Sequence, residues 1–287
     1  MKNTLKIGLA ALAVSTLGLA GCAQTSDAIV IGSQAYYSNE IVAEAYAQAL
    51  ENAGYEVERT FSLGQRDVYV PALLEGEVDL FPEYTGNLLQ YFDPSATQTE
   101  ANAVYDALSQ ALPGGLSALA MSPATDQDSY NVTQEFSQAN NISSIADLAN
   151  LDSVVLGGAP ELAERPYGPA GLLSVYQVMV DFNATGETTV ESLVAGEIDM
   201  ANVYSADPRI EQLGLVTLSD PLGLFLSSNL VPIASDALDA QARDVVSAVS
   251  LAMSAEELVA MNVRSVEEQL SAAEIAADWL RSEGLIN

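Results

Sequence analysis

The sequence lacks histidine, has one cysteine (Cys22), and places both of its lysines within the first six residues. Beyond Cys22, a disulfide and a thiol nucleophile are therefore excluded. Schiff-base chemistry, serine–histidine pairs and histidine-based zinc sites lack their residues as well. We find no glycine-rich phosphate loop, and we expect no cofactor and no metal. A hydrolase that works with two carboxylates is the enzyme class that these absences leave open.

Basic residues are scarce: two lysines and seven arginines accompany 39 acidic residues, which gives a formal net charge of −30. Nucleic acid is excluded as a partner because neutralising phosphates needs clustered cations. The acidity has two interpretations, a solvated surface suited to an external or salty medium, or attraction of cationic solutes. Salt screens surface charges beyond about 8–10 Å, which favours the first interpretation.

Residues 1–21 have the pattern of a secretory signal peptide. Lys2 and Lys6 precede a mostly apolar stretch, and the sequence Leu-Ala-Gly before Cys22 has the form of a bacterial lipobox. The apolar stretch is shorter than a typical membrane span. We therefore predict that Cys22 is lipidated, that residues 22–26 form a tether, and that the protein is extracytoplasmic and lipid-anchored to a bacterial membrane.

A twelve-residue segment occurs twice, 120 positions apart: LLEGEVDLFPEY at 73–84 and LVAGEIDMANVY at 193–204. The pattern predicts a helix end, a glycine cap, a polar turn and a short buried strand that ends in a tyrosine. Two distant copies suggest two similar α/β lobes. Tyr84 and Tyr204 would then lie at strand carboxyl ends, where open α/β sheets bind ligands. The alternative is a shared packing motif with incidental tyrosines.

Strands alternate with helices along the chain, which predicts parallel sheets. We expect Ser38 or Asn39 to cap the first helix, and we expect the residues after 229 to be helical. The predicted crossings between the lobes are 122–128 and 220–229, so that one lobe comprises 27–124 with 229–287 and the other 125–228. The expected strands are 28–32, 55–61, 116–121, 154–156 and 215–218, and the expected helices are 38–53, 67–75, 100–112 and 169–180.

Several motifs resemble those of the substrate-binding proteins of osmoprotectant ABC importers, which take up glycine betaine, choline or carnitine. The specific signal is Pro-Glu-Tyr-Thr-Gly at 82–86 after Gly-Glu-Val-Asp; further matches are Ile-Gly-Ser-Gln at 31–34, Glu-Leu-Ala-Glu-Arg-Pro at 161–166 and the closing segment 276–286. The resemblance covers residues 28–287. It implies a two-lobed periplasmic-binding-protein clamshell (type II) of the α/β class with two interlobe crossings, no catalysis, and an ABC permease with its ATPase as partners.

The resemblance also implies a ligand site, because family members hold a trimethylammonium group in a cage of tyrosines and a betaine carboxylate with Lys and Arg. Tyr84 and Tyr204 match two cage tyrosines, and Arg165 matches the arginine. Gln34 stands where betaine binders often have Lys, and Asn87 where Thr is usual. Asp128 and Ser228 fall where two further tyrosines are expected. The predicted ligand-binding residues are Gln34, Tyr36, Tyr84, Thr85, Asn87, Asp126, Asp128, Arg165, Tyr204 and Asn229.

These departures favour a cationic solute over a zwitterion. Asp126 or Asp128 could neutralise a cation directly, replacing the attraction of an aromatic ring with a full charge. The function that we predict is binding of a quaternary-ammonium osmoprotectant between the lobes and its delivery to a permease. The alternatives are another small polar solute, such as an aromatic betaine or an uncharged compatible solute, the carboxylate-dependent hydrolase, and a lipoprotein that only scaffolds partners.

Overall fold

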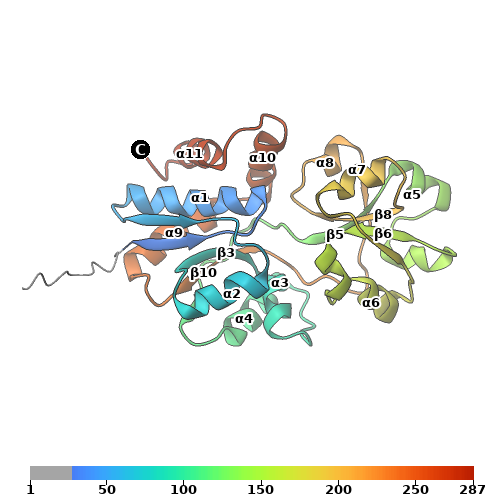
Figure 1. Cartoon of the computed structure of the whole chain (residues 1–287), viewed down its shortest axis with the longest axis horizontal. Helices are drawn as coiled ribbons and strands as arrows, with labels where there is room; N and C mark the ends of the chain where they lie inside the picture. Colours follow the sequence, from blue (N-terminus) through green and yellow to red (C-terminus); the bar gives the residue numbers. More distant parts are fainter. Residues whose placement is uncertain (1–27) are drawn as a thin grey trace, which may run out of the picture.

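The computed structural model describes residues 28–287, which form two lobes side by side (Figure 1). The predicted signal peptide, the tether and Cys22 lie outside the described residues. Each lobe is built on a five-stranded sheet, in the orders β2-β1-β3-β10-β4 and β7-β6-β8-β5-β9. The predicted α/β class with two lobes and two crossings is confirmed. Within residues 28–287 we find no helix with the length and apolarity that a membrane crossing requires.

The first lobe takes elements from both ends of the chain. Its strands are β1 (Ile29–Gly32), β2 (Val57–Thr60), β3 (Leu80–Tyr84), β4 (Leu116–Ala118) and β10 (Leu230–Ser235). Its helices are α1 (Tyr37–Asn52), α2 (Arg66–Glu75), α3 (Thr85–Phe92), α4 (Ala101–Ala111), α9 (Ala240–Ala252), α10 (Ala255–Val266) and α11 (Ala272–Ser282).

The second lobe is continuous in sequence. Its strands are β5 (Asp128–Val132), β6 (Val155–Gly158), β7 (Asp181–Ala184), β8 (Met200–Tyr204) and β9 (Val216–Thr217). Its α-helices are α5 (Gln134–Asn140), α6 (Pro169–Gly171), α7 (Thr189–Val194) and α8 (Arg209–Gln212). Shorter helical turns are η1 (Ile145–Asn150), η2 (Pro160–Glu164), η3 (Leu172–Tyr176) and η4 (Gly186–Thr188).

Helices cover both faces of the first sheet, so that an apolar core lies on each face. Residues of β10 contribute to both cores. Leu230 and Ala234 pack with α1, α9, α10 and α11 on one face. Val231 and Ile233 pack with α2, α3 and α4 on the other. This alternation is the two-residue period of a strand buried on both faces.

The prediction that the residues after 229 are helical is wrong for β10. This strand runs antiparallel to β3 and β4, with Pro232 in register with Pro82. A proline inside an apolar run argues against a central strand, so the local sequence gave a misleading signal. The prediction of parallel sheets is likewise wrong in part: β1, β2 and β3 are parallel, and so are β6, β7 and β8, whereas β5 pairs antiparallel with β8 and β9.

Two helix predictions also need correction. The helix expected over 169–180 ends at Tyr176, because Gln177 adopts a left-handed conformation with φ 60°. Neither Ser38 nor Asn39 caps α1, which begins at Tyr37. Asn39 instead accepts a hydrogen bond from the Gln34 N–H and donates to the Pro82 carbonyl, so this side chain joins the loop before α1 to strand β3.

The two copies of the repeated segment have the same backbone conformation at their glycine and make the same hydrogen bonds through their aspartate. Gly76 and Gly196 end a helix with φ 75° and 74°, which only glycine adopts without strain. The Asp79 carboxylate accepts the N–H of Val30 at 3.0 Å, and that of Asp199 accepts the N–H of Val155 at 2.8 Å. Each aspartate also donates its own N–H to the carbonyl of the same valine. The repeated segment therefore fixes a neighbouring strand against each tyrosine-bearing strand.

We predict that Asp79→Ala and Asp199→Ala each lower the free energy of unfolding by about 1–3 kcal/mol, because each leaves a strand N–H without its charged acceptor. Chemical denaturation measures the change. Glu77→Gln is the matched control, since Glu77 is exposed and lies two residues from Asp79. Aspartate variants as stable as this control would contradict the strand-fixing role.

Candidate functional site

Tyrosines from both lobes meet between the lobes, at the ends of two strands. Tyr84 ends β3 and Tyr204 ends β8, while Tyr36 precedes α1. The rings of Tyr36 and Tyr204 are stacked across the lobes, with centroids 5.5 Å apart and planes 19° apart. Burial raises the pKa of the Tyr36 hydroxyl well above its usual value, and Tyr84 and Asp126 raise it further. Three tyrosines and a carboxylate therefore gather at one place.

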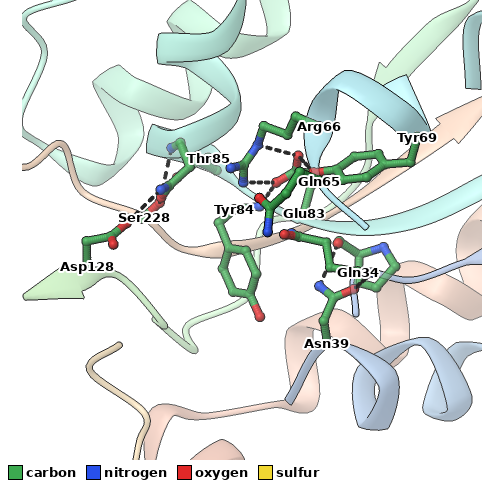
Figure 2. Close-up of polar contacts among 12 residues, drawn as sticks. Gln34, Asn39, Gln65, Arg66, Tyr69, Glu83, Tyr84, Thr85, Asp128 and Ser228 are labelled. Atoms are coloured by element: carbon green, nitrogen blue, oxygen red, sulfur yellow. Dashed lines mark hydrogen bonds and ion pairs between the residues drawn. The ribbon is translucent and has the colours of Figure 1, made fainter. Parts of the chain in front are cut away.

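The two strand-end tyrosines differ in exposure. Tyr84 is buried at 3% exposed, whereas Tyr204 keeps 39% of its surface exposed. The Tyr84 hydroxyl has no hydrogen bond of good geometry, although the side chains of Tyr36, Ser38 and Asn39 lie near it. Its ring projects into the space between Asp128 on one side and Gln34 with Asn39 on the other (Figure 2). A buried hydroxyl without a partner is costly, which makes it a candidate to receive a polar group of a ligand.

Asp126 lies on the first crossing and touches both lobes. One carboxylate oxygen accepts the Ser38 hydroxyl of α1 at 3.1 Å, and the other accepts the Ala206 N–H after β8 at 3.0 Å. Burial raises the pKa of Asp126 to about 7, although these two hydrogen bonds act in the opposite direction. Asn262 of α10 completes the cluster by donating to the Ser38 hydroxyl and to the Ala206 carbonyl.

Asp128 opens β5 and faces the first lobe. Its carboxylate accepts the Asn87 amide of α3 at 2.8 Å, and the same amide nitrogen donates to the Tyr167 hydroxyl at 3.1 Å. Ser228, on the second crossing, donates to the Asn87 side-chain oxygen. A cavity of about 10 Å³ beside this group is lined in part by Asn87, Asp128 and Tyr167. That volume admits about one water molecule.

A buried ion pair fixes the strand end that carries Tyr84. Arg66 of α2 binds both oxygens of Glu83, at 2.9 and 2.8 Å, with Glu83 fully buried (Figure 2). Tyr69 donates its hydroxyl to the same carboxylate, which also accepts the Tyr84 N–H at 2.7 Å. Four hydrogen bonds to one carboxylate satisfy the buried charge and orient the backbone at Tyr84.

Arg165 is the predicted carboxylate-binding arginine. Among residues 28–287 it is the arginine without an ion pair, whereas the other six each have at least one. Its guanidinium donates to the Gln65 side-chain oxygen of the first lobe at 3.4 Å. This unpaired cation at the edge of the interlobe region is therefore free to receive an anionic group.

Thr85 and Asn229, also predicted as ligand-binding residues, use their polar atoms on the backbone. The Thr85 hydroxyl donates to the Ser227 carbonyl and accepts the Asn229 N–H. The Asn229 amide donates to the Ser122 carbonyl, which ties the second crossing to the first. These contacts hold the crossings together beside Tyr84. Direct ligand contact by Thr85 and Asn229 stays a prediction.

Sequence reasoning did not select several residues that the structure brings to this region. Tyr167 carried a signal, as one of many tyrosines near predicted loops, and Glu83 lies within the specific Pro-Glu-Tyr motif. Ser38 and Asn262, 224 positions apart, meet only through the fold.

In residues 28–287 no group of three or more acidic side chains is arranged to hold a metal ion.

Comparison with known proteins identifies the family. Residues 27–282 match the family described as the substrate binding domain of the ABC-type glycine betaine transport system. The chain is 26% identical over 285 residues to the glycine betaine-binding protein YehZ of Escherichia coli K12, covering 91% of this chain and 92% of that protein.

Two further similarities are more distant. The chain is 24% identical over 212 residues to the ergothioneine transport permease/ergothioneine binding protein EgtU of Helicobacter pylori G27, covering 69% of this chain and 36% of that longer protein. The crystal structure of a glycine betaine/carnitine/choline ABC transporter superposes with a TM-score of 0.75 at 18% identity, covering 90% of this chain and all of that one. The latter shows the fold.

Proposed function

The chain belongs to the family of substrate-binding domains of ABC-type glycine betaine transport systems, and we propose that it binds a quaternary-ammonium osmoprotectant between its lobes. The observation that supports this most is the stacking of Tyr36 on Tyr204 across the lobes, beside Tyr84 and Asp126. Tyrosine faces attract a quaternary ammonium group through their quadrupole, by ~0.5–2 kcal/mol for each ring.

Charge around the tyrosines favours a choline-type cation. Burial raises the pKa of the Tyr204 hydroxyl, and the buried carboxylates of Asp128 and Asp126 raise it further. A carboxylate near the ligand stabilises a cation by a full charge, which a zwitterion partly offsets with its own carboxylate. Arg165 is the group that would compensate the carboxylate of glycine betaine or carnitine, because it has no ion pair among the described residues.

Ligand entry requires the tyrosines to move. A cation lies within about 6 Å of the centroid of each ring that holds it. The rings of Tyr36 and Tyr204, with centroids 5.5 Å apart, leave no room for a trimethylammonium group between their faces. We therefore propose that binding separates these rings through movement at the two crossings.

A second candidate solute is an aromatic betaine. The similarity to EgtU, whose name describes ergothioneine binding, favours this class. The family and its relatives are substrate-binding proteins of transport systems and not enzymes. A carboxylate-dependent hydrolase is therefore a weaker proposal than either solute.

We also propose that the protein is anchored outside the cytoplasm through a lipidated Cys22 and delivers its solute to an ABC permease. The lipobox sequence supports the anchor, and two acyl chains suffice for stable membrane attachment. Expression of Cys22→Ser in a bacterium should move the protein from the membrane fraction to the soluble fraction. Membrane association equal to that of the parent would contradict the anchor.

We predict that Tyr84→Ala and Tyr204→Ala each weaken choline binding by ~1–2 kcal/mol, because each removes an aromatic face that the bound ligand would cover. Calorimetry with choline, glycine betaine, carnitine and ergothioneine measures the loss. Tyr204→Phe keeps the ring and serves as the matched control. If both alanine variants bind like the parent, the region between the repeated strands is not the site.

Arg165→Ala distinguishes the ligand classes in the same assay. We expect a large loss for glycine betaine or carnitine, whose carboxylate pairs with the guanidinium, and little change for choline, which has no anion. An equal loss for choline and glycine betaine would show that Arg165 acts through the closed arrangement of the lobes and not through a ligand carboxylate.

A further inference from the structure

Asp126 is a buried carboxylate at the centre of the interlobe region, with 3% of its surface exposed. It accepts hydrogen bonds from the Ser38 hydroxyl of the first lobe and from the Ala206 N–H of the second. Ser38 lies two residues after Tyr36 and Ala206 two residues after Tyr204, and the rings of these two tyrosines are stacked on each other. Burial raises the pKa of Tyr36, Tyr37, Tyr84 and Tyr204, and the charge of Asp126 raises it further. The carboxylate therefore faces the same space as the rings proposed to hold the cationic head.

The charged surroundings of Asp126 are mainly acidic. Asp128 of β5 and Asp207, which follows β8, both raise its pKa, and the tyrosines from α1, β3 and β8 contribute neutral hydroxyls. From α10 the group beside it is the neutral amide of Asn262. Arg209 of α8 pairs with Asp207 and Glu191. Asp126 has no cationic partner in an ion pair among residues 28–287.

Resting on the proposed function, we propose that Asp126 selects the charge of the solute, and that the arrival of a quaternary ammonium group drives a proton off its carboxyl group. The step is an exchange: the carboxylic acid loses its proton to solvent, and the carboxylate that remains is neutralised by the fixed positive charge of the ligand. No covalent bond to the ligand forms. A solute without a fixed cation cannot drive this exchange.

The direction of the pH effect follows from the exchange. Below the pKa of ligand-free Asp126, which burial raises to about 7, binding must remove a proton, so affinity falls as the solution becomes more acidic. Above that pKa the carboxylate is already ionised and affinity is constant. The chain has no histidine, so Asp126 has little competition from other groups that titrate between pH 6 and 8.

Asp128 provides a matched control within the same region. It is also a buried aspartate, but its carboxylate is already engaged with the Asn87 amide. Asp128→Asn removes a neighbouring negative charge and leaves Asp126 in place. Asp126→Asn keeps an oxygen for the Ala206 N–H and a polar group beside the Ser38 hydroxyl, so it removes the titration with little change in shape.

The test is calorimetry with choline, whose charge does not titrate, between pH 5.5 and 8.5 in buffers of different ionisation enthalpy. For the parent we expect affinity to rise by about tenfold per pH unit below pH 7 and to level off above it, with release of about one proton at the acidic end. Asp126→Asn should bind more weakly at pH 8.5, with affinity independent of pH. Asp128→Asn should keep the pH slope, but affinity should level off at a lower pH than in the parent, because Asp128 raises the pKa of Asp126.

Parent protein that binds choline with constant affinity and releases no proton overturns this inference and leaves the proposed function standing. The same holds if Asp126→Asn keeps the slope of the parent. Failure of the parent to bind any quaternary ammonium solute at any pH overturns the proposed function and this inference together. The proton count of the parent is decisive even if Asp126→Asn does not fold.

Discussion

Each crossing of the chain between the lobes continues into a strand that pairs antiparallel with a tyrosine-bearing strand. β10 follows the second crossing and places Leu230 opposite Tyr84, while β5 follows the first and places Asp128 opposite Tyr204. The backbone hydrogen bonds of these pairs fix the crossings and the strand ends at one location. Movement of one lobe relative to the other must therefore change the spacing of the tyrosines, which is the physical link between lobe movement and solute binding.

Buried polar groups hold this region together on both sides. On the first lobe, the Glu83 carboxylate, which pairs with Arg66, accepts the Tyr84 N–H and orients the backbone at the end of β3. Between the lobes, Asp126 and Asn87 connect the crossings to α1, β5 and α3. Such networks stabilise only when nearly every donor and acceptor is satisfied. The Tyr84 hydroxyl is an exception, and it lies where the solute is proposed to bind.

The sequence predicted the two lobes because they depend on local patterns, and the same patterns placed Tyr84 and Tyr204 at strand ends. The repeated Gly-Glu-aliphatic-Asp motif has a structural role in both lobes. Its aspartate binds the backbone N–H of a neighbouring strand in each copy. The local sequence did not predict β10, because Pro232 lies inside an apolar run and a proline argues against a central strand. This strand is stabilised by its pairing with neighbouring strands. The stacking of Tyr36 on Tyr204 and the meeting of Ser38 with Asn262 depend on the final packing of the lobes.

The most direct test of the account is nuclear magnetic resonance of the protein with choline. Intermolecular Overhauser effects from the N-methyl protons identify the rings that surround the ligand, and single Tyr→Phe variants assign them. The account predicts effects to Tyr36 and Tyr84 of the first lobe and to Tyr204 of the second. Effects confined to one lobe, or to rings outside this group, would contradict binding between the lobes.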